Sequence, residues 1–208
     1  MTLEEYDKSK NVKSLIALWA FSESGLGGLL HALKLPLTGI TVGSIAVLCI
    51  ALISWYSNFN KRTLLAALSV VLLVKVTVSP HSPWAAYVAV TFQGFMGILL
   101  LNYKESFKIS VLIFAILCLF ESAVQRILIL FLVYGNQFIL SVDQAATQLA
   151  KQLGISSEIS MVQIGFAIYV FLHLFVGVLI GVKIPNFIQS LQRKVITLGN
   201  SDISSTSS

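Results

Sequence analysis

The sequence predicts an all-α integral membrane protein with six transmembrane helices, and two observations carry that prediction. Hydrophobic residues make up 56% of the 208 residues and charged residues 11%, whereas a soluble domain carries about 25% charged residues. The apolar residues form six runs, each close to the ~20 residues that cross the hydrocarbon core of a bilayer. We therefore expect a multi-pass protein of the cell (inner or plasma) membrane, surrounded by membrane lipid.

The six predicted spans are joined by polar connections, several of them short. Trp55 and Tyr56 end the second span, where their amphipathic rings suit the aromatic belt at the membrane interface. Lys75, Glu121 and His173 are ionisable residues inside the third, fifth and sixth spans. The spans cover residues 14–33, 38–56, 63–79, 84–101, 109–134 and 160–182.

Basic residues are distributed unequally over the connections between these spans. The N-terminal segment, two loops and the C-terminal segment carry ten of them, whereas the alternate connections hold only Lys34 and Lys151. Because lysine and arginine favour the cytoplasmic side, both termini are predicted to be cytoplasmic. The ten are Lys8, Lys10, Lys13, Lys61, Arg62, Lys104, Lys108, Lys183, Arg193 and Lys194.

Three segments outside the spans have their own patterns. Residues 1–183 form the predicted transmembrane domain, residues 184–198 a cytoplasmic amphipathic helix and residues 199–208 a disordered polar tail. In the outer connection, Ser141 is a predicted N-cap, Gln144 occupies the capping-box position and Gly154 follows the helix end. That short helix would cap the outer surface or serve as an interfacial connector.

Polar side chains inside the spans are the candidate substrate-binding residues, because they are predicted at mid-depth or in the outer half. An ionisable group at the bilayer centre costs at least ~2.5–3.5 kcal/mol, so helices turn it toward protein or a water-filled cavity. An alternative stays open, in which Glu23 pairs with Lys75, and Glu121 with Arg126, for purely structural reasons. The candidates are Glu23, His31, Lys75, Gln93, Glu121, Gln125, Arg126 and His173.

The sequence contains no pattern typical of an enzyme, a metal site or a cofactor site. It has no HExxH, GxSxG or Walker motif, and Cys49 and Cys118 lie in apolar runs without CxxC spacing. The net charge of +5 comes from basic residues between spans, which report topology rather than nucleic-acid binding. We therefore expect no catalysis, no cofactor, no metal and no nucleic-acid partner.

Small residues recur at helical spacing in several spans. Ala20, Ser24 and Gly28 form a stripe on the first span, and Gly39-x-x-x-Gly43 and Gly177-x-x-x-Gly181 are GxxxG patterns. Such patterns let helices approach closely. They predict close packing within the bundle or, for the stripe on the first span, docking of another membrane subunit.

This combination resembles the substrate-binding S components of energy-coupling-factor vitamin transporters. The resemblance rests on six spans in 208 residues, both ends cytoplasmic, polar groups toward the outer face and the small-residue stripe of the first span. In that family an AxxxA-type stripe on the first helix contacts the coupling subunit, and substrate lies near the outer helix ends. Here the stripe is Ala20-x-x-x-Ser24-x-x-x-Gly28, and no fingerprint of a particular vitamin is present.

The resemblance implies a small-solute binding and uptake subunit that works with a coupling membrane subunit and an ATPase. Its substrate would be a vitamin-like polar heterocycle, and Trp84, Tyr87 and Phe92 are predicted to stack on the ring. Two other classes stay open. One is a self-sufficient secondary carrier or proton-coupled exchanger, and the other is a non-transport membrane scaffold or assembly factor.

Overall fold

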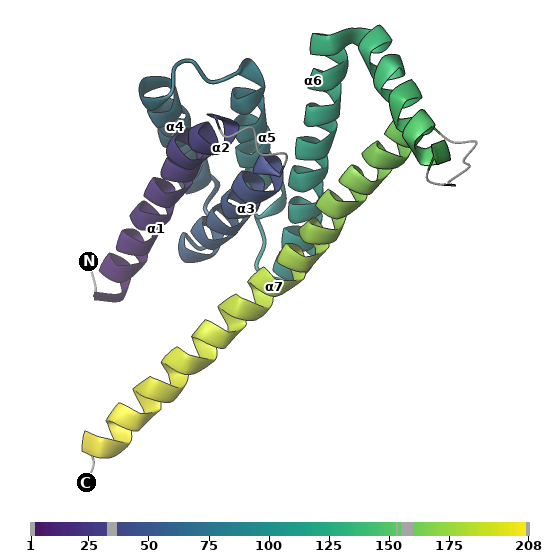
Figure 1. The fold of residues 1–208 in the computed structure, drawn as a ribbon. Coiled ribbons are helices and arrows are strands. Elements are labelled where there is room, and N and C mark those ends of the chain that lie inside the picture. Colours follow the sequence, from purple (N-terminus) through teal and green to yellow (C-terminus); the bar gives the residue numbers. More distant parts are fainter. Residues whose placement is uncertain (1–2, 33–36, 153, 155–159, 207–208) are drawn as a thin grey trace.

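The computed structural model describes residues 3–32, 37–152, 154 and 160–206, and all regular secondary structure among them is helical (Figure 1). The all-α prediction is therefore confirmed. The helices are α1 (Leu3–Phe21), the π-helical turn η1 (Ser22–Leu26), α2 (Gly27–Ala32), α3 (Thr38–Tyr56), α4 (Lys61–Val78), α5 (Trp84–Leu100), α6 (Phe107–Gln152) and α7 (Met161–Thr206).

Three helices are long and apolar enough to cross a bilayer: α3, α6 and residues 161–190 of α7. The next helix in apolar character, α5, has 17 residues. The bounds of α3 are those predicted, and those of α4 and α5 lie within two residues of the predicted ones. Helices therefore occupy all six predicted segments in the described chain, and three of them have the length and composition of a span.

Local sequence explains where α4 and α5 begin. Asn58 and Phe59 have positive φ angles of 53° and 62° and reverse the chain after α3. The Asn60 side chain then accepts a hydrogen bond from the Arg62 N–H as the N-cap of α4. Pro83 precedes α5, consistent with the tolerance of proline at helix starts.

Gly135 divides α6 into two arms. Its φ of 72° and ψ of 169° are non-helical, and in Figure 1 the green helix folds back at its upper end. The second arm begins directly after this bend, so the prediction that Ser141 caps a helix start is wrong: its Oγ donates to the Gln137 carbonyl inside the helix. Gly154, with φ of 78°, follows the arm as predicted.

The second arm of α6 is tied to the start of α7 by Asp143. Its Oδ1 accepts hydrogen bonds from the Val162 N–H (3.0 Å) and the Ser160 hydroxyl (2.7 Å). The Ser160 Oγ in turn accepts from the Gln163 N–H, which is N-cap geometry. These donors, the Val162 N–H first, hold the pKa of Asp143 below its usual value.

The central helix of the bundle is α3, which contacts α1, α4, α5, α6 and α7. Buried side chains such as Trp19, Ile50 and Phe114 fill the spaces around it. At one end Trp55 and Phe59 pack against Phe107 with ring centroids 5.2 and 5.5 Å away. These three rings form an aromatic cluster, and the polar residues described below lie toward the opposite end of α3.

Close packing of α6 against α7 depends on two glycines. A Cβ added at Gly177 would lie 3.2 Å from the Ala115 carbonyl oxygen, and one added at Gly181 would lie 2.8 Å from the Leu112 Cα. The backbones therefore approach where the sequence places its second GxxxG pattern. This confirms the prediction of close helix packing at that pattern.

Helix α7 is continuous from Met161 to Thr206 and includes Pro185. It extends well beyond the other helices in Figure 1. The helix has no break at residue 184 or 199, where the amphipathic helix and the polar tail were predicted to begin. The assignment of these parts to membrane, cytoplasmic surface and disordered tail stays a prediction.

Candidate functional site

The site begins with a helical irregularity at Glu23. Residues Ser22–Leu26 form a π-helical turn, closed by a hydrogen bond from the Gly27 N–H to the Ser22 carbonyl five residues earlier. Such turns are rare, and they occur often at functional sites. Within this turn, the Glu23 side chain is held in the bundle with only 5% of its surface exposed.

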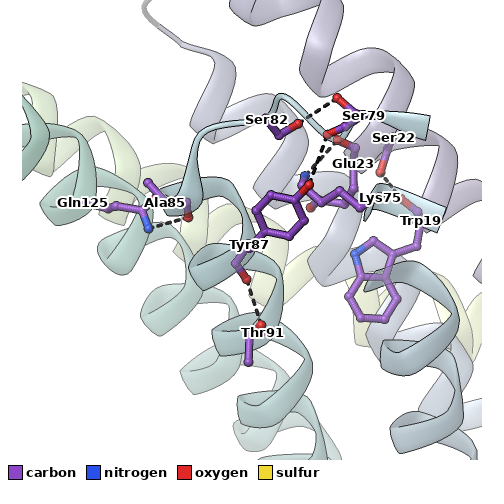
Figure 2. A network of polar contacts seen from close by, with 10 residues as sticks. All are labelled: Trp19, Ser22, Glu23, Lys75, Ser79, Ser82, Ala85, Tyr87, Thr91 and Gln125. Atoms are coloured by element: carbon purple, nitrogen blue, oxygen red, sulfur yellow. Dashed lines mark hydrogen bonds and ion pairs between the residues drawn. The ribbon is translucent and has the colours of Figure 1, made fainter. Parts of the chain in front are cut away.

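Lys75 of α4 is the partner of Glu23. Its Nζ lies 2.9 Å from Glu23 Oε2 and donates a second hydrogen bond, also 2.9 Å, to the Glu23 main-chain carbonyl (Figure 2). Lys75 is 2% exposed. A buried charge pair needs such additional hydrogen bonds to offset the loss of water around both ions. The predicted pairing of Glu23 with Lys75 is therefore confirmed.

A cavity of about 200 Å³ lies beside this ion pair. Five of the eight predicted substrate-binding residues line it: Glu23, Lys75, Gln93, Gln125 and Arg126. The remaining lining includes small residues of α2, α3 and α5, and Tyr169 of α7. Residues far apart in the sequence are thus brought together at one polar cavity between helices. This agrees with the prediction that they lie at similar heights along their helices.

Several buried polar atoms near this cavity make no hydrogen bond with any part of the chain that the structure describes. One of them is Oε1 of the cavity-lining Gln93, which is 3% exposed. The Glu23 carboxylate, by contrast, also interacts with the Trp19 side chain. Most buried polar atoms in folded proteins have a partner. The Gln93 amide therefore has hydrogen-bonding capacity that the described chain does not use.

Hydrogen bonds hold the chain around the rim of the cavity. The Gln125 amide donates to the Ala85 carbonyl at 2.8 Å, which ties α6 to the first turn of α5. Tyr87 donates its hydroxyl proton to the Ser79 carbonyl at 3.1 Å, and the Ser79 and Ser82 hydroxyls share a 2.7 Å hydrogen bond (Figure 2). These hydrogen bonds hold the connection between α4 and α5 in place. Ser82 of this connection lines the cavity.

Glu121 and Arg126 do not form the predicted ion pair. Glu121 is partly buried, and its Oε2 has no hydrogen-bond partner among the described residues. Arg126 is exposed at the edge of the cavity, near enough to Tyr169 for an electrostatic interaction. The alternative in which Glu121 pairs with Arg126 for structural reasons is therefore wrong, since no salt bridge joins these two described side chains.

The remaining two predicted residues have different outcomes. His173 is fully buried and donates from Nδ1 to the Tyr169 carbonyl at 2.9 Å, and it does not line the cavity. Its Nε2 has no partner in the described chain. The side chain of His31 lies outside the described residues, so its role stays a prediction.

The structure also adds residues that the sequence did not indicate. Ser122 and Tyr169 line the cavity, whereas Trp84, Tyr87 and Phe92 do not. The predicted stacking of these three rings on a ligand stays a prediction. Tyr169 belongs to α7, which packs against α6. No signal in the linear sequence distinguishes it from the other aromatic residues of the sixth span.

The small-residue stripe of the first span is divided by the π-helical turn. Ala20 and Ser24 are buried within the chain, and Gly28 is exposed. Burial of two of the three residues favours internal packing. The docking of a partner subunit on this stripe stays a prediction.

Comparisons of the chain with protein families, with curated proteins and with solved structures found no match.

Proposed function

We propose that this chain is a membrane-embedded binding subunit for a small polar solute. The observation that carries the proposal is the cavity of about 200 Å³, which is lined by a buried ion pair, by the buried amide of Gln93 and by Arg126. Ligand sites in membrane proteins combine irregular helices with polar groups turned away from lipid. The π-helical turn at Glu23 and the location of the cavity fit both features.

In this proposal the six helical segments cross the cell membrane with both termini in the cytoplasm. The ten-to-two asymmetry of basic residues supports that orientation. The 79–83 connection and the Gly135 bend lie at one end of the molecule in Figure 1, which would be the outer end. Reporter fusions at Asn60, Ser82 and Gln148 test it, with an outside signal expected from the last two. An inside signal from Ser82 would contradict the orientation.

Binding is tested by a thermal-shift screen of the purified protein in detergent against vitamins and nucleobase-like compounds. A hit is then titrated against Gln93→Leu and Arg126→Ala. Each variant is expected to lose at least tenfold in affinity, or about 1.4 kcal/mol. Glu105→Gln, an exposed site outside the cavity, is the control and should bind like the wild type. No hit, or unchanged affinity in both cavity variants, would refute the proposal.

The proposal includes a coupling membrane subunit and an ATPase that supply energy for uptake. Vesicles that contain the chain alone should bind a hit without accumulating it. Accumulation by the chain alone would favour a secondary carrier or proton-coupled exchanger. A scaffold would neither bind nor transport the solute. The Glu23–Lys75 ion pair is equally consistent with a scaffold, because such a pair can serve only to hold helices together.

A further inference from the structure

The formal charges on the cavity wall do not balance. Among the described lining residues, Glu23, Lys75 and Arg126 carry a formal charge. The Lys75 ammonium lies 2.9 Å from a Glu23 carboxylate oxygen, so these two charges offset each other. No salt bridge joins Arg126 to a carboxylate in the described chain. The lining therefore has a net positive charge, which one anionic group would neutralise.

The position of Arg126 makes an unpaired guanidinium costly. Arg126 lies nine residues before the Gly135 bend of α6, which is ~13 Å along the helix axis. On the proposed function this arm crosses the bilayer, where an unpaired cation is unfavourable. Glu121 on the same arm does not line the cavity, and the neighbouring Tyr169 carries no formal charge. The guanidinium therefore lacks an anionic partner within the described chain.

Two helices begin at the same cavity. Thr38 and Gly39 are the first two residues of α3, and Ala85 is the second residue of α5; all three line the cavity. The N-terminus of a helix carries a partial positive charge, which favours anions. Helix α4, which ends three residues after Lys75, contributes only that residue to the described lining. The helix ends therefore add to the positive potential that Arg126 creates.

A buried amide on α5 gives the site a second polar group. Gln93 is 3% exposed, lines the cavity and has an oxygen without a hydrogen-bond partner in the described chain. An amide both donates and accepts hydrogen bonds, and its two ends exchange by rotation. Gln93 can therefore bind neutral and anionic solutes alike. Arg126 is the residue that would select for charge.

The lining also includes apolar side chains of α3, α5 and α6, namely Val42, Ala86, Ala89 and Ile129. On the proposed function, which this inference requires, we propose that the solute is a small organic acid with one negative charge. Its carboxylate binds the Arg126 guanidinium, whose planar fork of N–H donors matches a carboxylate. Its apolar body lies beside Gln93 in the cavity of about 200 Å³.

Three probes of similar shape test the charge: benzoate, benzamide and benzamidinium. Their binding to the purified wild-type protein is measured at neutral pH by thermal shift and titration. We expect benzoate to bind about tenfold or more tightly than benzamide, as one hydrogen-bonded charge contact would give, and benzamidinium to bind most weakly. Rising salt should weaken benzoate but not benzamide, because salt screens an exposed charge contact. This readout needs no variant.

Two variants separate the charge of the site from the cavity itself. Arg126→Gln should weaken benzoate about tenfold or more and leave benzamide within about threefold. Gln93→Leu should weaken both probes. Arg62→Gln makes the same change of charge at an exposed position outside the cavity, and this control should bind both probes like the wild type.

The inference would be overturned by the absence of benzoate binding, by benzamide or benzamidinium binding as tightly as benzoate, or by unchanged benzoate affinity in Arg126→Gln or at high salt. If a neutral compound then binds the wild type and is weakened by Gln93→Leu, the proposed function stands without the inference. If neither the three probes nor any screened compound binds, both are overturned.

Discussion

Two glycines of the same helix predict opposite responses to alanine. Gly181 lies at the crossing of α7 with α6, where an added Cβ would be 2.8 Å from the Leu112 Cα and 2.9 Å from its Cδ1. Gly165 is exposed near the start of α7, and nothing lies within 4 Å of its Cβ position. Gly181→Ala therefore tests the helix crossing, and Gly165→Ala is the matched control in the same helix.

The size of the difference follows from two terms. Alanine is favoured over glycine inside a helix by about 0.8–1 kcal/mol, and both variants gain that term. Overpacking a well-packed site costs about 1–3 kcal/mol, and only Gly181→Ala incurs it because the obstacle is backbone. Gly165→Ala should therefore be more stable than wild type by about 1 kcal/mol, and Gly181→Ala less stable than Gly165→Ala by about 1–3 kcal/mol.

The measurement is the free energy of unfolding of the purified protein in mixed micelles, with helix content as the signal. A second measurement, the exchange of α6 and α7 amides, should locate the loss in Gly181→Ala at the crossing. Equal stability of the two variants would refute the reasoning, because the close approach of the backbones would then carry no energetic constraint.

Three further outcomes are expected. Lys75→Met should lower the free energy of unfolding by about 3–5 kcal/mol, because it leaves the buried Glu23 carboxylate without its ammonium partner. Adding Glu23→Gln should recover part of this loss, and additive effects in the double-mutant cycle would argue against the ion pair. Asp143→Asn should speed amide exchange at Val162 near pH 6, and this effect should diminish as the pH is lowered below 3.8. The lowered pKa of Asp143 means that its stabilisation is present above the usual value of 3.8 and is lost as pH falls through the lower folded value. An effect that does not change with pH would refute this. Ser24→Leu should destabilise the isolated chain by about 1–3 kcal/mol, because Ser24 is buried, and unchanged stability would favour a docking role.

The helices were predictable from the sequence because apolar runs and their polar boundaries are local signals. The bounds of α3, Thr38–Tyr56, follow from hydropathy alone. The grouping of Glu23, Lys75 and Gln93 around one cavity was also predictable, since polar groups in strongly apolar helices are expected to turn toward one another inside the bundle.

Other features depend on tertiary packing, which the linear pattern does not encode. The prediction that Glu121 pairs with Arg126 used sequence proximity, but the two side chains diverge on α6. Tyr169 lines the cavity from α7, which packs against α6, and that packing joins parts of the chain far apart in the sequence. The Ala20–Gly28 stripe assumed regular α-helical periodicity, which the π-helical turn at Ser22–Leu26 interrupts.

The π-helical turn also makes the site sensitive to the number of residues in the chain. A π turn accommodates one more residue than an α turn, and one residue corresponds to a rotation of about 100° around a helix axis. Because the turn absorbs this extra residue, deleting Gly25 would let the helix return to regular geometry with α1 and α2 near their present orientation. The deletion would mainly change the direction of Glu23, which lies inside the turn. We therefore expect it to separate Glu23 from Lys75 while leaving the rest of the bundle in place, and we expect relatives of this chain with the same site to conserve the spacing between Trp19 and Gly27.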